Sequence, residues 1–214
     1  MNYRFVLFDL DGTLLDTLGD LADATNASLR MMGLPELSLD GVRRRIGHGN
    51  WNLIKSSMPE GTADSDIEKA FIFFKQYYAD HCDVKTMPYD GVDKVLEGLA
   101  GAGVRFGIVS NKLDFLVKKL RDRFFPDMEY ASGGREGVPL KPDPAMIEDA
   151  MRYFGADRPE TLYVGDGEGD IETSRRAGID CLCSLWGFRS REELEKAGGE
   201  LFAETPGDIL KTVL

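Results

Sequence analysis

The sequence contains few of the residues that build zinc sites or disulfide frameworks, with three cysteines and two histidines among 214 residues. Cys82, Cys181 and Cys183 form an odd and sparse set, and no Cys or His partners stand at zinc-finger spacing. A disulfide or zinc scaffold is therefore disfavoured. We expect reduced, mostly buried thiols in a cytoplasmic protein.

Basic residues are outnumbered, at 26 against 37 acidic ones, which gives a net charge of −11. Affinity for a phosphate backbone comes mainly from clustered Lys and Arg, so this balance disfavours nucleic acid as a partner. It equally disfavours docking on an anionic membrane surface. No apolar stretch approaches the length of a membrane span, and the first apolar run ends at Asp9, too early for a signal-peptide core.

The chain does show a regular alternation of short apolar strands with amphipathic helices. Strands are predicted near 3–9, 104–109, 128–131, 161–164 and 179–185, with helices between most of them. Strands that alternate with helices of this length imply a parallel sheet covered on both faces. We therefore predict an α/β fold with a doubly wound, Rossmann-like parallel sheet.

A mostly helical stretch interrupts this alternation directly after the first strand. It starts near Thr17, whose side chain could cap the first helix. Its clearest helix is predicted over 64–81, where apolar residues recur at 3.6-residue spacing: Ile67, Ala70, Phe71, Phe74, Tyr77 and Tyr78. We predict a catalytic core made of residues 1–16 and 87–214, and a small inserted α-helical cap domain over 17–86.

The conspicuous polar residues stand where the predicted strands end. In a doubly wound sheet, ligands bind outside the carboxyl ends of the strands. Separate segments would thus bring four carboxylates, a hydroxyl, an amide and an ammonium to one crevice: Asp9, Asp11, Ser110, Asn111, Lys141, Asp166 and Asp170.

Four carboxylates that converge without compensation repel one another, and their pKa values rise. A hard divalent cation removes this conflict, and oxygen ligands with few imidazoles point to Mg²⁺. Such a site suits a phosphate dianion, with one carboxylate as nucleophile and another as acid and base. Taken singly, each residue has a plainer explanation as a turn, helix-cap or loop residue, so the prediction depends on their convergence.

Four motifs in this order resemble those of the haloacid dehalogenase (HAD) superfamily over the whole chain. They are Phe8-Asp9-Leu10-Asp11-Gly12-Thr13, Val109-Ser110-Asn111-Lys112, Lys141-Pro142-Asp143-Pro144, and Val164-Gly165-Asp166 through Asp170. The Ser-Asn-Lys string and Ile46-Gly47-His48-Gly49 are most similar to the phosphoglycolate phosphatase group. Two departures are Gly167, where a small hydroxyl residue is common, and Asp90-Gly91 in place of Pro-Gly.

The resemblance implies a role for each motif residue. Asp9 would be the nucleophile, and Asp11 would protonate the departing alkoxide and then deprotonate the attacking water. Mg²⁺ would be held by Asp9, the Asp11 carbonyl and Asp166, with Asp170 binding directly or through water. The phosphate would be held by Ser110, the Asn111 amide, Lys141 and the backbone of Gly12 and Thr13.

The resemblance implies a Mg²⁺-dependent phosphatase for a small phosphorylated metabolite, phosphoglycolate being the leading candidate, in a monomer or homodimer. A basic edge on the cap could select an anionic substrate, with Arg45 and His48 as candidate contacts; both could equally be surface residues. A phosphomutase, phosphonatase or pyrophosphatase of the same superfamily is the catalytic alternative. The non-catalytic alternative is a sensor module in which phosphorylated Asp9 signals rather than turns over.

Overall fold

The computed structural model describes residues 3–214 and contains a six-stranded sheet in which every neighbouring pair is parallel. The strand order is β5-β4-β1-β6-β7-β8. The strands are β1 (Phe5–Phe8), β4 (Arg105–Leu113), β5 (Tyr130–Gly134), β6 (Thr161–Gly165), β7 (Asp180–Ser184) and β8 (Leu201–Ala203). The predicted doubly wound α/β fold is confirmed.

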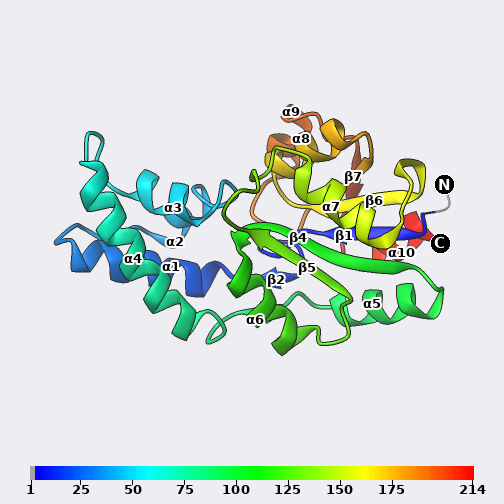
Figure 1. Ribbon diagram of the computed structural model, residues 1–214, viewed down its shortest axis with the longest axis horizontal. Helices are drawn as coiled ribbons and strands as arrows, with labels where there is room; N and C mark the ends of the chain where they lie inside the picture. The colour runs from blue at the N-terminus through cyan, green and yellow to red at the C-terminus, as the bar shows by residue number, and fades with distance from the viewer. Residues whose placement is uncertain (1–2) are drawn as a thin grey trace.

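Successive side chains of β1 point to opposite faces of the sheet. Both sets are apolar, so helices cover both faces. Val6 and Phe8 pack in the larger core cluster, whereas Phe5 and Leu7 pack in the smaller one. Figure 1 shows one layer below the sheet and one above it. The lower layer holds α5 (Val92–Gly101) and α6 (Asp114–Phe124), and the upper holds α7 (Ala145–Phe154), α8 (Glu168–Ala177) and α9 (Arg191–Lys196). The last helix, α10 (Gly207–Val213), shares the core cluster of α5.

Four helices lie beyond one end of the sheet, at the left of Figure 1. They are α1 (Leu18–Met31), α2 (Leu39–Arg43), α3 (Asn50–Ser57) and α4 (Asp64–His81). The chain enters and leaves this group through an antiparallel pair of short strands, β2 (Leu15–Asp16) and β3 (Met87–Pro88). The helix predicted over 64–81 is confirmed, with Ile67, Ala70, Phe74 and Tyr78 buried.

Two local predictions were wrong. The second strand does not stop at Val109 but continues as β4 to Leu113, with a register shift against β5 that carries Ser110 and Asn111 past the regular ladder. Thr17 does not cap α1 with its side chain: Asp16 Oδ1 accepts a hydrogen bond from the Leu18 amide at 3.2 Å, and the buried Thr17 hydroxyl has no hydrogen-bond partner within residues 3–214.

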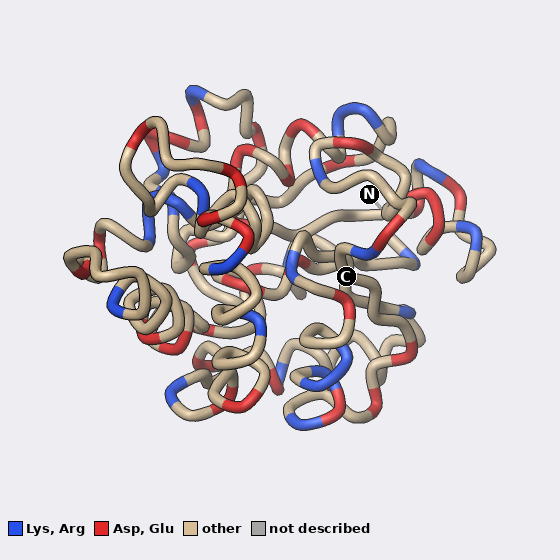
Figure 2. The backbone as a smooth tube through the Cα atoms, turned by 60° about the vertical axis from the view of Figure 1, so that its left-hand side comes forward, with Lys and Arg blue, Asp and Glu red and all other residues tan. Residues whose placement is uncertain are grey.

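Three expectations drawn from the composition can be compared with the structure: the charge distribution, the membrane spans and the state of the cysteines. Acidic and basic residues are interspersed over the outer loops and helices (Figure 2). Among residues 3–214, no helix is both long and apolar enough to cross a membrane. The three cysteines are free, with Cys82 and Cys183 buried and Cys181 half-buried.

Candidate active site

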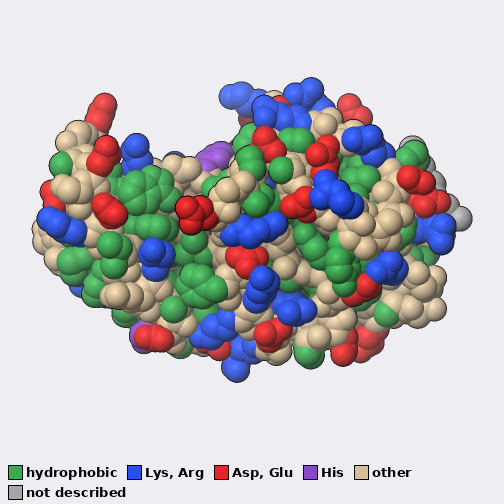
Figure 3. All heavy atoms as spheres, in the orientation of Figure 1, with side chains coloured by type: hydrophobic (Ala, Val, Ile, Leu, Met, Phe, Trp, Pro, Cys, Tyr) green, Lys and Arg blue, Asp and Glu red, His purple; other side chains and the backbone are tan. Residues whose placement is uncertain are grey.

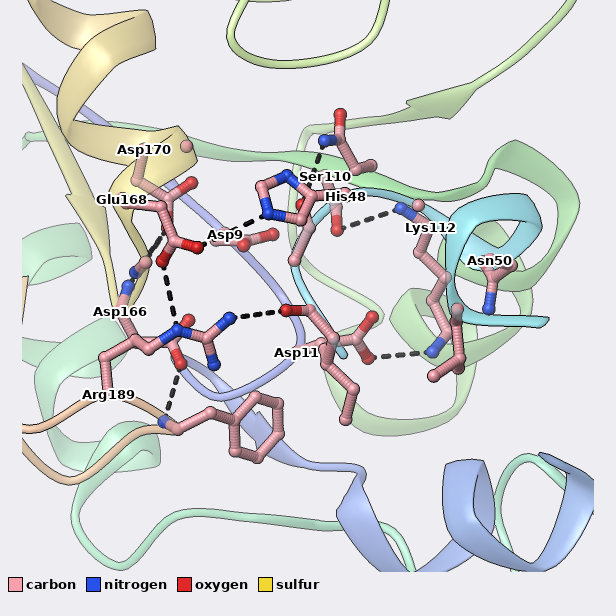
Figure 4. A pocket seen from close by; sticks show the side chains of 18 of the residues that line it. Asp9, Asp11, His48, Asn50, Ser110, Lys112, Asp166, Glu168, Asp170 and Arg189 are labelled. Atoms are coloured by element: carbon pink, nitrogen blue, oxygen red, sulfur yellow. Dashed lines mark hydrogen bonds and ion pairs between the residues drawn. The ribbon is translucent and has the colours of Figure 1, made fainter. Parts of the chain in front are cut away.

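Three carboxylates meet where β1 and β6 end. The two strands pair in register, Phe8 beside Val164, so Asp9 and Asp166 emerge from adjacent strand ends. Asp170 joins them from the first turn of α8. Oxygen atoms of all three buried carboxylates lie within 4.8 Å of one another. Figure 4 shows them gathered on one side of a pocket.

Glycines permit this close approach. Gly12 has φ +80°, and a Cβ there would collide with the Asp166 carboxylate. A Cβ at Gly165 would likewise collide with the carboxylate of Asp170. Glycine is therefore needed at both positions, because any side chain there would displace an aspartate of the cluster.

Lys141 supplies the positive charge inside the cluster. Its Nζ lies 2.9 Å from Asp9 Oδ2 and 2.6 Å from Asp170 Oδ1. The Tyr163 hydroxyl also accepts a hydrogen bond from this ammonium, at 2.9 Å. Burial disfavours the charged ammonium, but the carboxylates of Asp170 and Asp9 outweigh that cost and raise the pKa of Lys141 above its ordinary value.

One ammonium does not neutralise three buried carboxylates. Burial raises the pKa of Asp9 to about 6, against the opposing effect of Lys141. Burial and the negative charges of Asp170 and Asp9 hold the pKa of Asp166 well above its usual range. This all-oxygen donor set fits a hard divalent cation, which would relieve the remaining repulsion.

Each carboxylate is already oriented by hydrogen bonds. Asp9 Oδ1 accepts from the Leu10 amide at 2.7 Å, and Asp166 Oδ2 accepts from the Phe188 amide at 2.7 Å. Asp170 Oδ2 accepts from the amides of Asp166 and Gly167 at 3.1 and 3.0 Å. The three carboxylates are thus oriented by backbone amides of the loops that follow β1, β6 and β7.

The pocket above the cluster is lined by the expected phosphate-binding motif at the end of β4. Ser110 and Asn111 are both buried and both line it. The Asn111 side chain accepts from the Lys141 amide at 2.7 Å and donates to the Lys141 carbonyl at 3.0 Å. It therefore fixes the loop that carries the lysine.

Gly12 and Thr13 lie beside the cluster and are not among the residues that line this pocket. The Thr13 hydroxyl is 3.4 Å from Asp166 Oδ1, and the Thr13 carbonyl accepts from Trp186 Nε1 at 3.0 Å.

The inserted helices close the pocket from the other side. Figure 3 shows the surface hollowed between these helices and the sheet domain. His48 and Asn50 line the pocket, and His48 Nε2 is 3.4 Å from Glu168 Oε1. Contact with Glu168 raises the pKa of His48 above 6.5, and contact with His48 lowers the pKa of Glu168 to about 2.

Arg45, an expected substrate contact, lies elsewhere. Its guanidinium donates to the carbonyls of Gly41 and Ser56 within the inserted helices, at 2.6 and 2.8 Å. It lines a separate hollow together with Lys55, and it is absent from the lining of the Asp9 pocket. The side chain is occupied in holding α2 against α3.

Comparison with known proteins agrees with this geometry. Residues 6–183 match the model of the haloacid dehalogenase-like hydrolase family. The chain belongs to this family.

Relatives of this hydrolase span nearly its whole length. It is 31% identical over 210 residues to a phosphoglycolate phosphatase of Aquifex aeolicus, covering 97% of this chain and 95% of the relative. It is 35% identical over 196 residues to a phosphoglycolate phosphatase of Xylella fastidiosa, covering 89% and 83%. A crystal structure of a predicted phosphoglycolate phosphatase from Haemophilus somnus superposes with a TM-score of 0.92 at 26% identity, covering 100% and 99%.

Sequence reasoning missed two cations of this hydrolase's pocket. Lys112 is the last residue of the Val109-Ser110-Asn111-Lys112 motif, so the sequence indicated its position but not its role. Arg189 had no motif around it. Its side chain pairs with Glu168 at 3.0 Å and donates to the carbonyl of Ile46 at 2.7 Å, which joins the sheet domain to the inserted helices.

Proposed function

We propose that this hydrolase is a Mg²⁺-dependent phosphatase that cleaves a small phosphomonoester through an aspartyl-phosphate on Asp9. Asp9 lines the pocket, and the observation that carries the proposal is its 2.9 Å contact with the buried Lys141 ammonium. Asp11 lines the same pocket, two residues along the chain. A nucleophile and an acid–base group therefore face one space, and a charge-neutralising ammonium contacts the nucleophile.

In the first step, an Asp9 oxygen attacks phosphorus while the bond from phosphorus to the ester oxygen breaks. The Asp11 carboxyl gives its proton to the departing alkoxide. Lys141 offsets the negative charge that Asp9 and the phosphoryl group bring together. Ser110 and the Asn111 amide bind the phosphoryl oxygens.

In the second step, water attacks the aspartyl-phosphate and Asp11 takes its proton. The bond from phosphorus to Asp9 breaks, which frees inorganic phosphate, restores the Asp9 carboxylate and leaves Asp11 protonated for the next cycle. Mg²⁺ would be held by Asp9, Asp166 and the Asp11 carbonyl, with Asp170 nearby. When bound, it neutralises charge on the phosphate oxygens.

We assign residues 17–86 as a cap over a core made of 1–16 and 87–214, and phosphoglycolate as the leading substrate candidate. The names of the relatives support this candidate. His48 lies in the pocket, where its imidazole could meet an anionic group of the substrate. A panel of small phosphorylated metabolites, compared by kcat/KM, tests the assignment. Highest kcat/KM for a phosphorylated sugar or a nucleotide would overturn it.

The test of the chemistry is hydrolysis of phosphoglycolate and of an aryl phosphate by wild type, Asp9→Asn and Asp16→Asn, each with Mg²⁺ and with EDTA. We expect Asp9→Asn to lower kcat more than about 1,000-fold, as loss of a nucleophile does. The exposed Asp16 is the matched control, and its variant should keep wild-type activity. If wild type shows no turnover while Asp9 stays phosphorylated for hours, the protein is a phospho-acceptor sensor instead.

A further inference from the structure

Lys112 is a buried cation that the mechanism above does not use. Its side chain is fully buried at the end of β4. The ammonium donates to Asp11 Oδ1 at 2.8 Å and to the Tyr78 hydroxyl at 2.6 Å, and it lies 4.6 Å from the centre of the Tyr78 ring. Removing an ammonium from water costs several kcal/mol, so these partners must compensate for it.

The contact with Lys112 determines how the Asp11 carboxylate is oriented. Among residues 3–214, the Lys112 ammonium is the one group that donates a hydrogen bond to this carboxylate, and it does so at Oδ1. The other oxygen, Oδ2, is thus left available to a substrate. Figure 4 shows the ammonium and the carboxylate facing each other across the pocket wall.

The second partner comes from the inserted helices. Tyr78 lies on α4, more than 30 positions before Lys112 in the sequence, and it is completely buried. Burial and the negative charge of Asp11 hold the pKa of Tyr78 well above its usual range, so the hydroxyl stays neutral. A neutral hydroxyl accepts from the ammonium without competing with Asp11 for its charge.

We propose that Lys112 and Tyr78 are positioning residues for Asp11, which align its free oxygen with the leaving-group oxygen of the substrate only while α4 is packed against the sheet domain. This inference rests on the proposed function, since it needs Asp11 as the acid and base. Lys112 neither gives nor receives a proton. The proton moves from Asp11 to the alkoxide in the first step and from water to Asp11 in the second.

The experiment compares two substrates that differ in their need for an acid. An alkyl phosphate such as phosphoglycolate has an alkoxide leaving group that needs a proton. The p-nitrophenolate of p-nitrophenyl phosphate is a weak base and leaves without protonation. The variants are Lys112→Met, which keeps the length of the side chain, and Tyr78→Phe, which removes only the hydroxyl. Lys118→Met and Tyr153→Phe are matched controls on exposed or half-exposed side chains.

We expect Lys112→Met to lower kcat on the alkyl phosphate by about 100-fold, the lower end of what acid–base catalysis contributes. KM should stay within about threefold, and kcat on p-nitrophenyl phosphate should fall by less than about fivefold. Tyr78→Phe should also lower kcat mainly on the alkyl phosphate, by a smaller factor than Lys112→Met. The double variant should be no slower than Lys112→Met alone, because both changes act through one contact.

Equal losses on both substrates, or a rise confined to KM, would overturn the inference and make Lys112 a substrate-binding or purely structural residue. Tyr78→Phe with wild-type kinetics on the alkyl phosphate would overturn the part assigned to α4. Failure of the proposed function is distinguishable, because wild type itself would then turn over neither substrate.

Discussion

At the scale of single residues, the pocket holds a carboxylate whose negative charge is disfavoured both by burial and by its neighbours. Asp166 is 5% exposed, and its pKa is raised by burial and by the neighbouring Asp170 and Asp9. Among the described residues, one backbone amide, that of Phe188, and one hydroxyl, that of Thr13, donate to its carboxylate, and these two hydrogen bonds do not cancel its charge. The cation that we propose would complete this balance.

The contact between His48 and Glu168 gives a prediction on pH. The pKa of His48 is raised above 6.5, so any stability from this contact is complete below pH 6.5 and is lost as the pH rises through the folded-state pKa. His48 is half-exposed, so the effect on stability is small. We expect Glu168→Gln to lower the pKa of His48, measured by NMR titration of the ring signals.

The chain provides an internal control for this titration, because its only other histidine is His81. Its ring lies on α4 and stacks on Tyr77. The His81 ring signals should be unaffected by Glu168→Gln. An unchanged His48 pKa in the variant would show that the two side chains do not pair in solution.

At the scale of elements, sequence periodicity was most informative where a helix or strand is regular. The 3.6-residue spacing located α4 because one face of that helix is buried. It could not locate the end of β4, which continues through Ser110 and Lys112 to Leu113 across an irregularity in its pairing with β5. It also failed at Thr17, since the choice between two neighbouring capping side chains depends on tertiary packing.

In the site too, only residues on regular elements or in motifs could be predicted from the sequence. Asp9, Asp166 and Lys141 could be predicted to converge because strand ends of a parallel sheet share one edge. Arg189 could not, since it lies in a loop with no regular pattern and reaches the pocket through contacts with the Ile46 carbonyl. Arg45 was misplaced because a basic side chain near a pocket need not face it.

Asp20 joins the start of α1 to the segment that follows α4. Its buried carboxylate accepts from the amides of Val84, Lys85 and Thr86 at 2.9 to 3.1 Å and from the Thr86 hydroxyl at 2.8 Å. Hydrogen bonds to a charged group contribute more than neutral ones. We expect Asp20→Asn to lower the free energy of unfolding by about 2 kcal/mol, measured by urea denaturation.

Asp23→Asn is the control for this measurement, because Asp23 is half-exposed and, among residues 3–214, forms its one ion pair with the exposed Lys85 side chain. Its variant should change the free energy of unfolding by less than about 0.5 kcal/mol. Equal effects of the two variants would show that the buried carboxylate does not hold the segments together.

At the scale of the whole molecule, the site is assembled from segments far apart in sequence, so metal binding should stabilise the entire fold. A ligand at 100 times its Kd adds about 2.7 kcal/mol to the native state. We expect Mg²⁺ to raise the Tm by several degrees over EDTA, and Asp166→Asn to abolish the shift. Differential scanning fluorimetry measures both, with the exposed Asp127→Asn as control. A full shift in Asp166→Asn would place the ion elsewhere.

The most direct measurement of the central claim is chemical trapping of the covalent intermediate. Borohydride reduces an acyl phosphate to an alcohol, so enzyme quenched during turnover with Mg²⁺ and substrate should carry homoserine in place of Asp9. Fragmentation of the tryptic peptide over residues 5–30 assigns the position among its several aspartates. We predict the change at Asp9 alone, and none with EDTA or in Asp9→Asn. Rapid turnover with no modified residue, or with the change at Asp11, would contradict the account.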